Sequence, residues 1–163
     1  MAIKVKSGSE SSILSVGAYR PSRIVPNSEI VDLIDSSDEW IVQRTGIESR
    51  RFARADESVV DMAIGAAEQA LSRAKLTIND VDSVIVATIT YPHQAPSAAT
   101  AVIQRMGNPT AAAFDISAAC AGFCYGVAMA HDLIRAGSAK KVVVVGVLIT
   151  SPGGCGEGKP SRE

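Results

Sequence analysis

The sequence lacks any apolar run long enough to cross a lipid bilayer. Its longest such runs, at 122–130 and 142–149, fall well short of the roughly 20 residues that a membrane helix needs. It also lacks an excess of either charge, since 16 basic residues face 17 acidic ones and are scattered along the chain. These absences indicate that neither a membrane nor nucleic acid is a main partner.

Cysteine is scarce as well, with three residues in the whole chain. Two of them, Cys120 and Cys124, lie four residues apart around the start of one predicted helix, and such a pair does not make a disulfide framework. We therefore expect a reducing, cytoplasmic environment.

What the sequence does contain is an alternation of strand and helix patterns. β-Branched or alternating apolar runs predict strands at 13–19, 84–89, 111–116 and 142–149. Helical spacing and capping residues predict helices at 29–34, 59–74, 97–106 and 121–136, and residues 47–53 are predicted to be extended. Strand–helix–strand order with short connections predicts an α/β fold, with helices on both faces of a mixed, largely parallel sheet.

Some of these elements carry a prediction about burial. Strands 84–89 and 142–149 are continuous, mostly β-branched and largely apolar runs, which is typical of strands covered on both faces. Helix 121–136 is apolar nearly all round, so we expect it to be buried between two layers.

A further helix is predicted to begin at Ser36 or Ser37 and to stop at Gly46. A serine is a good helix cap, and Asp38 in the first turn suits the positive end of the helix dipole. Glycine is the usual residue just past the end of a helix. This helix would carry Trp40, the single tryptophan of the chain.

Both ends of the chain differ from the rest. Residues 1–12 are predicted to be a flexible leader, 13–149 a domain, and 150–163 a disordered or aberrant tail. The tail resembles a phosphate-binding loop, but Pro160 stands where a hydroxyl must meet magnesium, and no helix follows. We therefore reject nucleotide binding there.

Cys120 lies at the corner between the strand predicted at 111–116 and the helix predicted at 121–136. At the start of a helix, backbone N–H groups and the positive end of the helix dipole favour the thiolate, which is the nucleophilic form of cysteine. The same spacing also fits a small buried residue, because free cysteine is among the most buried residue types. The residues alone leave both interpretations open.

Three segments of the chain together resemble one enzyme family. They are residues 13–21, residues 34–47 with the run Ser-Ser-Asp-Glu-Trp-Ile, and residues 114–123 with the run Ala-Cys-Ala-Gly-Phe. They are similar to β-ketoacyl-acyl carrier protein synthase III, the condensing enzyme that starts bacterial fatty acid synthesis and some polyketide pathways. The resemblance implies the N-terminal half of a thiolase-like layered fold over 13–149.

The resemblance implies an acyltransferase in which Cys120 takes an acyl primer from acyl-coenzyme A (acyl-CoA) and condenses it with malonyl-acyl carrier protein. It also implies a homodimer, acyl-CoA as a substrate rather than a permanent cofactor, and no metal. The histidine and asparagine that promote decarboxylation in this family belong to a second half, which we expect this chain to lack. The alternative is a catalytically incomplete fragment that at most acylates itself, binds acyl-CoA or dimerises.

The resemblance also places coenzyme A contacts on three residues of the 34–47 segment. It implies that Trp40 stacks on the adenine, that Arg44 lies near the nucleotide phosphates, and that the Ser36 hydroxyl lies beside the base. Spaced four residues apart, these positions would share one helix face. The spacing fits equally a tryptophan packed under a surface helix and covered by Arg44, and spacing alone favours that alternative.

Other candidate reactive groups have smaller predicted roles. Cys124 lies one turn beyond Cys120 and is predicted to fill the core. His131 lies eleven residues along the same helix, about 16 Å from Cys120 at the rise of an α-helix, which is too far for a Cys–His pair. His93 lies in a predicted loop and would line the primer pocket at most.

Overall fold

The computed structural model describes residues 10–149, which form two compact units. The sheet unit comprises residues 10–19 and 59–148, and the hairpin unit comprises residues 20–58. The predicted tail at 150–163, with its rejected phosphate loop, lies outside the described residues, as do residues 1–9 of the predicted leader.

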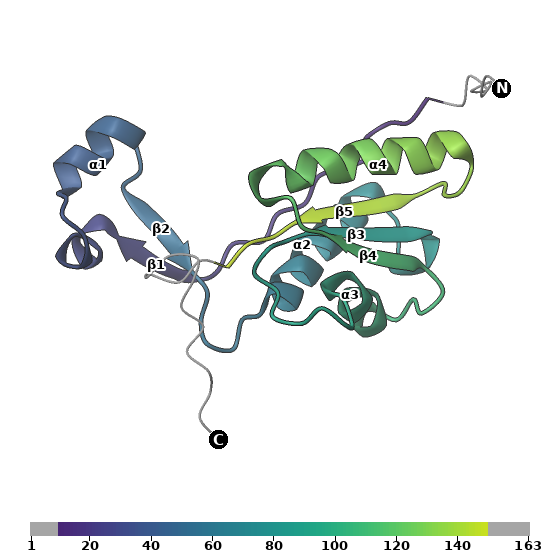
Figure 1. The fold of residues 1–163 in the computed structure, drawn as a ribbon, viewed down its shortest axis with the longest axis horizontal. Helices are drawn as coiled ribbons and strands as arrows, with labels where there is room; N and C mark the ends of the chain where they lie inside the picture. The colour runs from purple at the N-terminus through teal and green to yellow at the C-terminus, as the bar shows by residue number, and fades with distance from the viewer. Residues whose placement is uncertain (1–9, 150–163) are drawn as a thin grey trace. The chain divides into compact units, whose positions relative to one another are not determined.

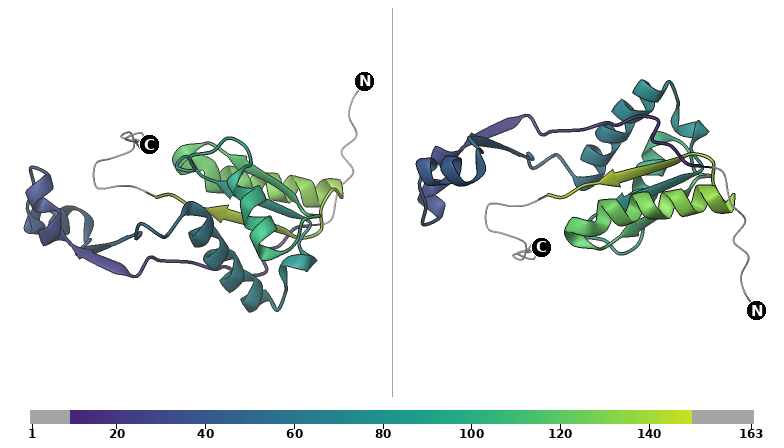
Figure 2. Two further views of the ribbon diagram at one scale, coloured as in Figure 1. Left: turned by 90° about the horizontal axis from the view of Figure 1, so that it is seen from below. Right: turned by 90° about the horizontal axis from the view of Figure 1, so that it is seen from above.

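The sheet unit is built on parallel strands in the order β4-β3-β5. The strands are β3 (Ser83–Ala87), β4 (Ala112–Ile116) and β5 (Val142–Gly146). Helix α4 (Gly122–Ala136) covers one face, and α2 (Val59–Ala74) and α3 (Ala98–Met106) cover the other (Figure 1, Figure 2). This arrangement confirms the predicted α/β fold with a parallel sheet and helices on both faces.

Burial within the sheet follows strand position. All residues of the central strand β3 are buried, as predicted. In β5 only Val145 is buried, and the strand ends at Gly146. The prediction of a fully covered strand at 142–149 is therefore wrong. The reason is that β5 is an edge strand, which pairs on one side only in the described part of the chain.

Residues 13–19 do not form the predicted strand. None of the strands in the described range pairs with them, and the segment instead runs along α2. The Ser15 hydroxyl donates to the backbone carbonyl of Ala70 at 2.7 Å. Gly17 permits this approach, because a Cβ at that position would collide with the carbonyl oxygen of Ala66. An alternating pattern is not sufficient for a strand, since a strand also needs a neighbour for its backbone hydrogen bonds.

Helix α4 lies close to the sheet because its inner positions carry small residues. Gly122, Gly126 and Ala130 are its buried positions, and they recur at every fourth residue. A Cβ on Gly126 would lie 2.8 Å from Cγ1 of Val144 in β5, and one on Gly122 would lie 3.0 Å from the Ala87 Cβ. The helix therefore contacts β3 and β5 with almost no side chain between its backbone and the strands.

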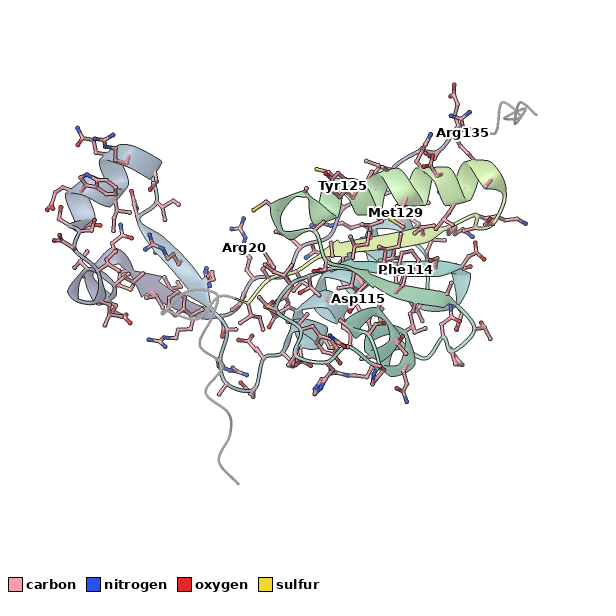
Figure 3. All side chains as sticks on the ribbon, viewed as in Figure 1. Arg20, Phe114, Asp115, Tyr125, Met129 and Arg135 are labelled. Atoms are coloured by element: carbon pink, nitrogen blue, oxygen red, sulfur yellow. The ribbon has the colours of Figure 1, made fainter. Side chains whose placement is uncertain are left out.

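The outer side of α4 is open to solvent. Tyr125 and Met129 of this helix are exposed (Figure 3), and so is Phe123, although its ring lies beside Gly146 of β5. The prediction that helix 121–136 is buried between two layers is therefore wrong for residues 10–149, because the sheet covers one side and no described element covers the other. Although α4 is apolar, neither it nor any other described helix is long and apolar enough to span a membrane.

The hairpin unit consists of an antiparallel strand pair and a helix. Strand β1 (Arg23–Pro26) pairs with β2 (Ser49–Phe52), and α1 (Asp38–Thr45) lies between them in the sequence. The extended segment predicted at 47–53 is confirmed. The helix predicted at 29–34 is wrong, because short 3₁₀ turns form there instead, and a segment this short gains too few α-helical hydrogen bonds.

Asn27 joins the elements of the hairpin unit. It is almost fully buried, and its Nδ2 donates to Oδ1 of Asp38 at 2.7 Å and to the carbonyl of Ile47 at 2.8 Å. Its Oδ1 accepts a hydrogen bond of 2.7 Å from Arg50 on β2. One amide side chain thus connects the end of β1, the start of α1 and strand β2, and every polar atom of that side chain has a partner.

We predict that Gly126→Ala destabilises the sheet unit, although alanine is the better helix former. The added methyl would meet Val144, whose β-branched side chain has little rotamer freedom, and overpacking of this kind costs about 1–3 kcal/mol. The control is Ala128→Gly on the exposed side of the same helix, where only helix propensity acts and the cost is about 1 kcal/mol. Urea unfolding should show both variants destabilised; a stabilised Gly126→Ala variant would contradict the close contact.

Asp82 provides a second link, at the amino ends of the strands. Its Oδ2 accepts hydrogen bonds from the backbone N–H groups of Lys140 at 2.7 Å and Lys141 at 2.9 Å. These bonds, with that from Lys141 first, lower the pKa of Asp82. The carboxylate therefore stabilises the fold fully above its unfolded pKa of about 3.9, and this stabilisation is lost as the pH falls through the lower folded pKa.

We expect Asp82→Asn to lower the Tm at neutral pH and to lie nearer the parent chain in strong acid. The asparagine cannot be ionised, so the variant should lose the part of the acid dependence that Asp82 supplies. Thermal unfolding recorded from about pH 7 down to about pH 2 checks this. A difference between the two proteins that widens on acidification would show that the sign is wrong.

Candidate functional site

The carboxyl ends of the parallel strands meet at one edge of the sheet. Ile116 of β4 and Gly146 of β5 both pair with Ala87 of β3, so the strands end level with one another. The loop after β3 leads to α3 on one face, whereas the turn after β4 leads to α4 on the other. Where successive connections diverge to opposite faces, α/β sheets place their ligands. This edge is therefore the candidate site of the sheet unit.

Cys120 lies in the turn that leaves this edge after β4. The turn is a single 3₁₀ turn, Ala119–Ala121, directly followed by α4. Within it, the N–H of Ala121 donates to the carbonyl of Ala118 at 3.0 Å. The predicted strand-to-helix corner is confirmed. Cys120 is exposed, so the alternative of a small buried residue does not hold in the described chain.

The residue before the cysteine has an unusual backbone. Ala119 adopts a φ of 43°, in the left-handed region that residues other than glycine seldom occupy. For an alanine this conformation costs roughly 1–2 kcal/mol. Backbone strain of this kind concentrates at functional sites, where surrounding contacts hold it in place. The strain therefore supports the assignment of the turn as a site.

Cys124 does not fill the core as predicted. It is exposed, like Cys120, because the sheet covers only the stripe of α4 that contains Gly122 and Gly126. Both cysteines are exposed, but their backbone settings differ. Cys120 belongs to the strained turn, and Cys124 to the regular helix.

The histidines have partners of their own. Nδ1 of His131 lies 2.6 Å from the hydroxyl of Ser11, a contact that ties the N-terminal segment to α4. His93 lies in the loop after β3, where its ring meets that of Tyr91 edge-on with centroids 5.4 Å apart. A role for His93 in a primer pocket stays a prediction. Within residues 10–149, no three His, Cys, Asp or Glu side chains are grouped as a metal site requires.

In the hairpin unit, Trp40 and Arg44 lie side by side on α1. The Ser37 hydroxyl caps the helix by accepting from the Trp40 N–H at 3.2 Å, and Gly46 ends it with a φ of 68°. The Arg44 guanidinium carbon lies 5.6 Å from the centre of the Trp40 ring. Arg44 lies over the ring, but Trp40 is 54% exposed, so it is not packed under the helix. The pair presents exposed aromatic surface beside a cation.

Ser36 does not share that face. The helix begins only at Asp38, and Ser37 is extended, so Ser36 precedes the helix. The expected common face for positions 36, 40 and 44 is therefore wrong for Ser36. Its Oγ is buried, and among the described residues it has no hydrogen-bond partner. It would have to rotate to reach a ligand in solvent.

Asp115, which the sequence analysis missed, is a polar residue of the candidate site. It precedes Ile116 at the end of β4 (Figure 3), and its carboxylate accepts from the N–H groups of Ala98 and Ala99, both at 2.8 Å. The available signal was an aspartate inside an otherwise apolar strand. Its partner could not be found from sequence, because it is the start of a helix 16 residues earlier.

The chain is similar in sequence to proteins of one family. The family described as 3-oxoacyl-[acyl-carrier-protein (ACP)] synthase III matches residues 114–153. A β-ketoacyl-[acyl-carrier-protein] synthase III from Kocuria rhizophila is 52% identical over 83% of this chain and 38% of that protein. A mycobacterial β-ketoacyl-[acyl-carrier-protein] synthase III from Mycobacterium ulcerans is 51% identical over 86% of this chain and 42% of that protein.

Solved structures show the same similarity. The priming β-ketosynthase from the R1128 polyketide biosynthetic pathway superposes with a TM-score of 0.83 at 39% identity, over 91% of this chain and 44% of that one. The 3-oxoacyl-[acyl-carrier-protein] synthase III from Aquifex aeolicus gives a TM-score of 0.79 at 40% identity, over 83% and 44%. The chain thus spans less than half the length of each of these relatives.

Proposed function

Because the chain belongs to the β-ketoacyl-acyl carrier protein synthase III family and forms the N-terminal part of its thiolase-like fold, we propose that Cys120 accepts an acyl group from acyl-CoA. The observation that carries this proposal is the exposed Cys120 in a strained turn at the carboxyl edge of the sheet. The edge is a place where α/β folds bind ligands, and a thiol there can act as a nucleophile.

The proposed step is a thioester exchange. Sγ of Cys120, as the thiolate, attacks the acyl carbonyl carbon, and a new S–C bond forms as the bond from that carbon to the sulfur of coenzyme A breaks. The leaving coenzyme A thiolate takes up a proton, so the cysteine and the coenzyme exchange acyl group and proton without any oxidation. Backbone N–H groups near the turn are the expected donors to the oxyanion that forms in between.

The whole protein's reaction is a further part of the proposal. In it, the acyl group on Cys120 is condensed with malonyl-acyl carrier protein by a cytoplasmic homodimer, to start fatty acid or polyketide synthesis. The name of one solved relative supports the polyketide pathway, and the family resemblance supports the fatty acid pathway. The histidine and asparagine that the family resemblance implies for decarboxylation do not map onto the residues described here. For the 163-residue chain itself we therefore propose the loading step alone.

Coenzyme A is proposed to bind at α1. The exposed ring of Trp40 offers a face on which adenine can stack, and the Arg44 guanidinium beside it offers a bidentate donor for phosphate. Ser36 would join the contact after rotation about its Cα–Cβ bond. Trp40 and Arg44 belong to the hairpin unit, and Cys120 to the sheet unit.

A second candidate function is a protein that binds acyl-CoA or a second copy of itself without turnover. The observation that favours it is the exposed apolar side of α4, since exposed apolar surface tends to be covered by association. The two candidates make opposite predictions for acylation of the chain.

We expect incubation with acetyl-CoA to add one acetyl group to the chain, seen as a gain in intact mass. Cys120→Ala should abolish the gain, because it removes the proposed nucleophile. Cys124→Ala is the matched control, since Cys124 is also exposed and lies on the next helical turn, and it should leave the gain intact. A mass gain that survives in Cys120→Ala, or no gain in the parent chain, would refute the loading step and leave the binding candidate.

We also expect coenzyme A to quench the fluorescence of the chain. Trp40 is the single tryptophan, so any quenching by adenine stacking reports on that residue alone. Arg44→Gln should weaken binding about tenfold, as loss of a charge-assisted hydrogen bond does. Arg23→Gln removes the same charge from an exposed site of the hairpin unit outside α1 and should have little effect. Equal losses in both variants would indicate general charge attraction rather than a site at α1.

A further inference from the structure

Both carboxylate oxygens of Asp115 accept hydrogen bonds from the start of helix α3. Oδ2 accepts from the N–H of Ala98 and Oδ1 from the N–H of Ala99, each at 2.8 Å. The hydroxyl of Ser97 accepts from Thr100 N–H at 3.1 Å. The first N–H groups of α3, which have no partner within the helix, are therefore satisfied, two of them by a carboxylate from another element.

The hydrogen bonds of the Asp115 carboxylate connect the two chain segments that leave the candidate site. Residues 88–97 lead from the end of β3 to the start of α3, where the Asp115 carboxylate is bound. Asp115 itself belongs to β4, and the turn to Cys120 begins two residues later. Next to it, the Ile116 carbonyl accepts from the N–H of Thr88 at 3.1 Å. One side chain and one backbone bond thus fix the start of the cysteine turn against the loop after β3.

The other end of the turn is fixed by packing. Gly122, the first residue of α4, lies against Ala87, the last residue of β3. The strained Ala119 lies between these two anchors. A residue can be kept in such a conformation only when its surroundings hold it there. Loosening either anchor should therefore let the turn relax and shift the sulfur of Cys120.

We propose that Asp115 is a positioning residue for Cys120, because its carboxylate holds the end of β4, and thereby the strained cysteine turn, against the start of α3. The proposal rests on the proposed function for the role of Cys120 and adds a residue that acts through it. A carboxylate suits this task because both of its oxygens accept, and because negative charge is stabilised at the start of a helix.

Asp82 supplies a control with the same chemistry at the opposite end of the sheet. Its carboxylate also accepts two backbone N–H bonds, from Lys140 and Lys141, but at the amino ends of the strands. If Asp115 only stabilises the fold, substitutions at Asp115 and Asp82 should affect unfolding alike and leave the reactivity of Cys120 alone. If Asp115 positions the turn, only its variants should change that reactivity.

The experiment measures alkylation by iodoacetamide in two single-cysteine chains. One keeps Cys120 with Cys124 and Cys155 replaced by alanine, and the other keeps Cys124 with the remaining two replaced. Asp115→Ala, Asp115→Asn and Asp82→Asn are introduced into each, and rates are followed by intact mass. Circular dichroism gives the folded fraction, to which every rate is referred. Asp115→Asn retains one acceptor oxygen, so it serves as the test if Asp115→Ala does not fold.

We expect Asp115→Ala to slow alkylation of Cys120 about tenfold, and Asp115→Asn to slow it less, because the reactivity of a cysteine at the start of a helix depends on its position relative to the first N–H groups of that helix. Cys124 should stay within about twofold in every variant, and so should Cys120 in Asp82→Asn. An unchanged or faster Cys120 rate, or equal slowing of Cys124, or equal slowing by Asp82→Asn, would overturn the proposal.

Parallel incubation with acetyl-CoA separates this proposal from the proposed function. If the alkylation pattern holds but the parent chain gains no acetyl group, the loading step fails and the positioning role stands. If the parent chain is acetylated and the Asp115 variants are alkylated and acetylated at the parent rate, the positioning role fails and the loading step stands.

Discussion

The close approach of α4 to the sheet is the constraint on which the candidate site depends. Gly122 and Gly126 bring the helix backbone against β3 and β5. A side chain added at Gly126 would collide with Val144. Because the first residue of α4 rests on the last residue of β3, the turn that joins β4 to α4 has little freedom. Cys120 lies in that turn, so two glycines without side chains help to fix the position of its sulfur.

Aspartates at the two ends of the sheet complete this framework. Asp82 binds backbone N–H groups at the amino ends of the strands, and Asp115 does so at the carboxyl ends. Within residues 10–149, neither of these two aspartates forms an ion pair. Backbone amides are fixed by the fold, so a carboxylate bound to them joins main-chain segments with defined geometry, which a flexible surface ion pair does not achieve.

For the candidate site, sequence reasoning succeeded where the relevant geometry is local. The neighbouring Trp40 and Arg44 follow from the i, i+4 spacing of a helix, and the corner that carries Cys120 follows from a strand pattern that meets a helix pattern. It failed for Ser36, because the helix begins one residue after the cap at Ser37. It also missed Asp115, whose partner lies in another element of the fold.

Local patterns were enough to predict the helices at 59–74 and 97–106, the buried strand β3 and the parallel α/β class, because periodicity and capping are properties of neighbouring residues. The sequence by itself also determined the family, through short runs of residues around Trp40 and Cys120. The position of residues 13–19 along α2 and the exposure of the outer side of α4 came from the folded structure and not from any local pattern. Whether a strand pairs or a helix face is covered depends on neighbours far away in the chain, and no local pattern contains them.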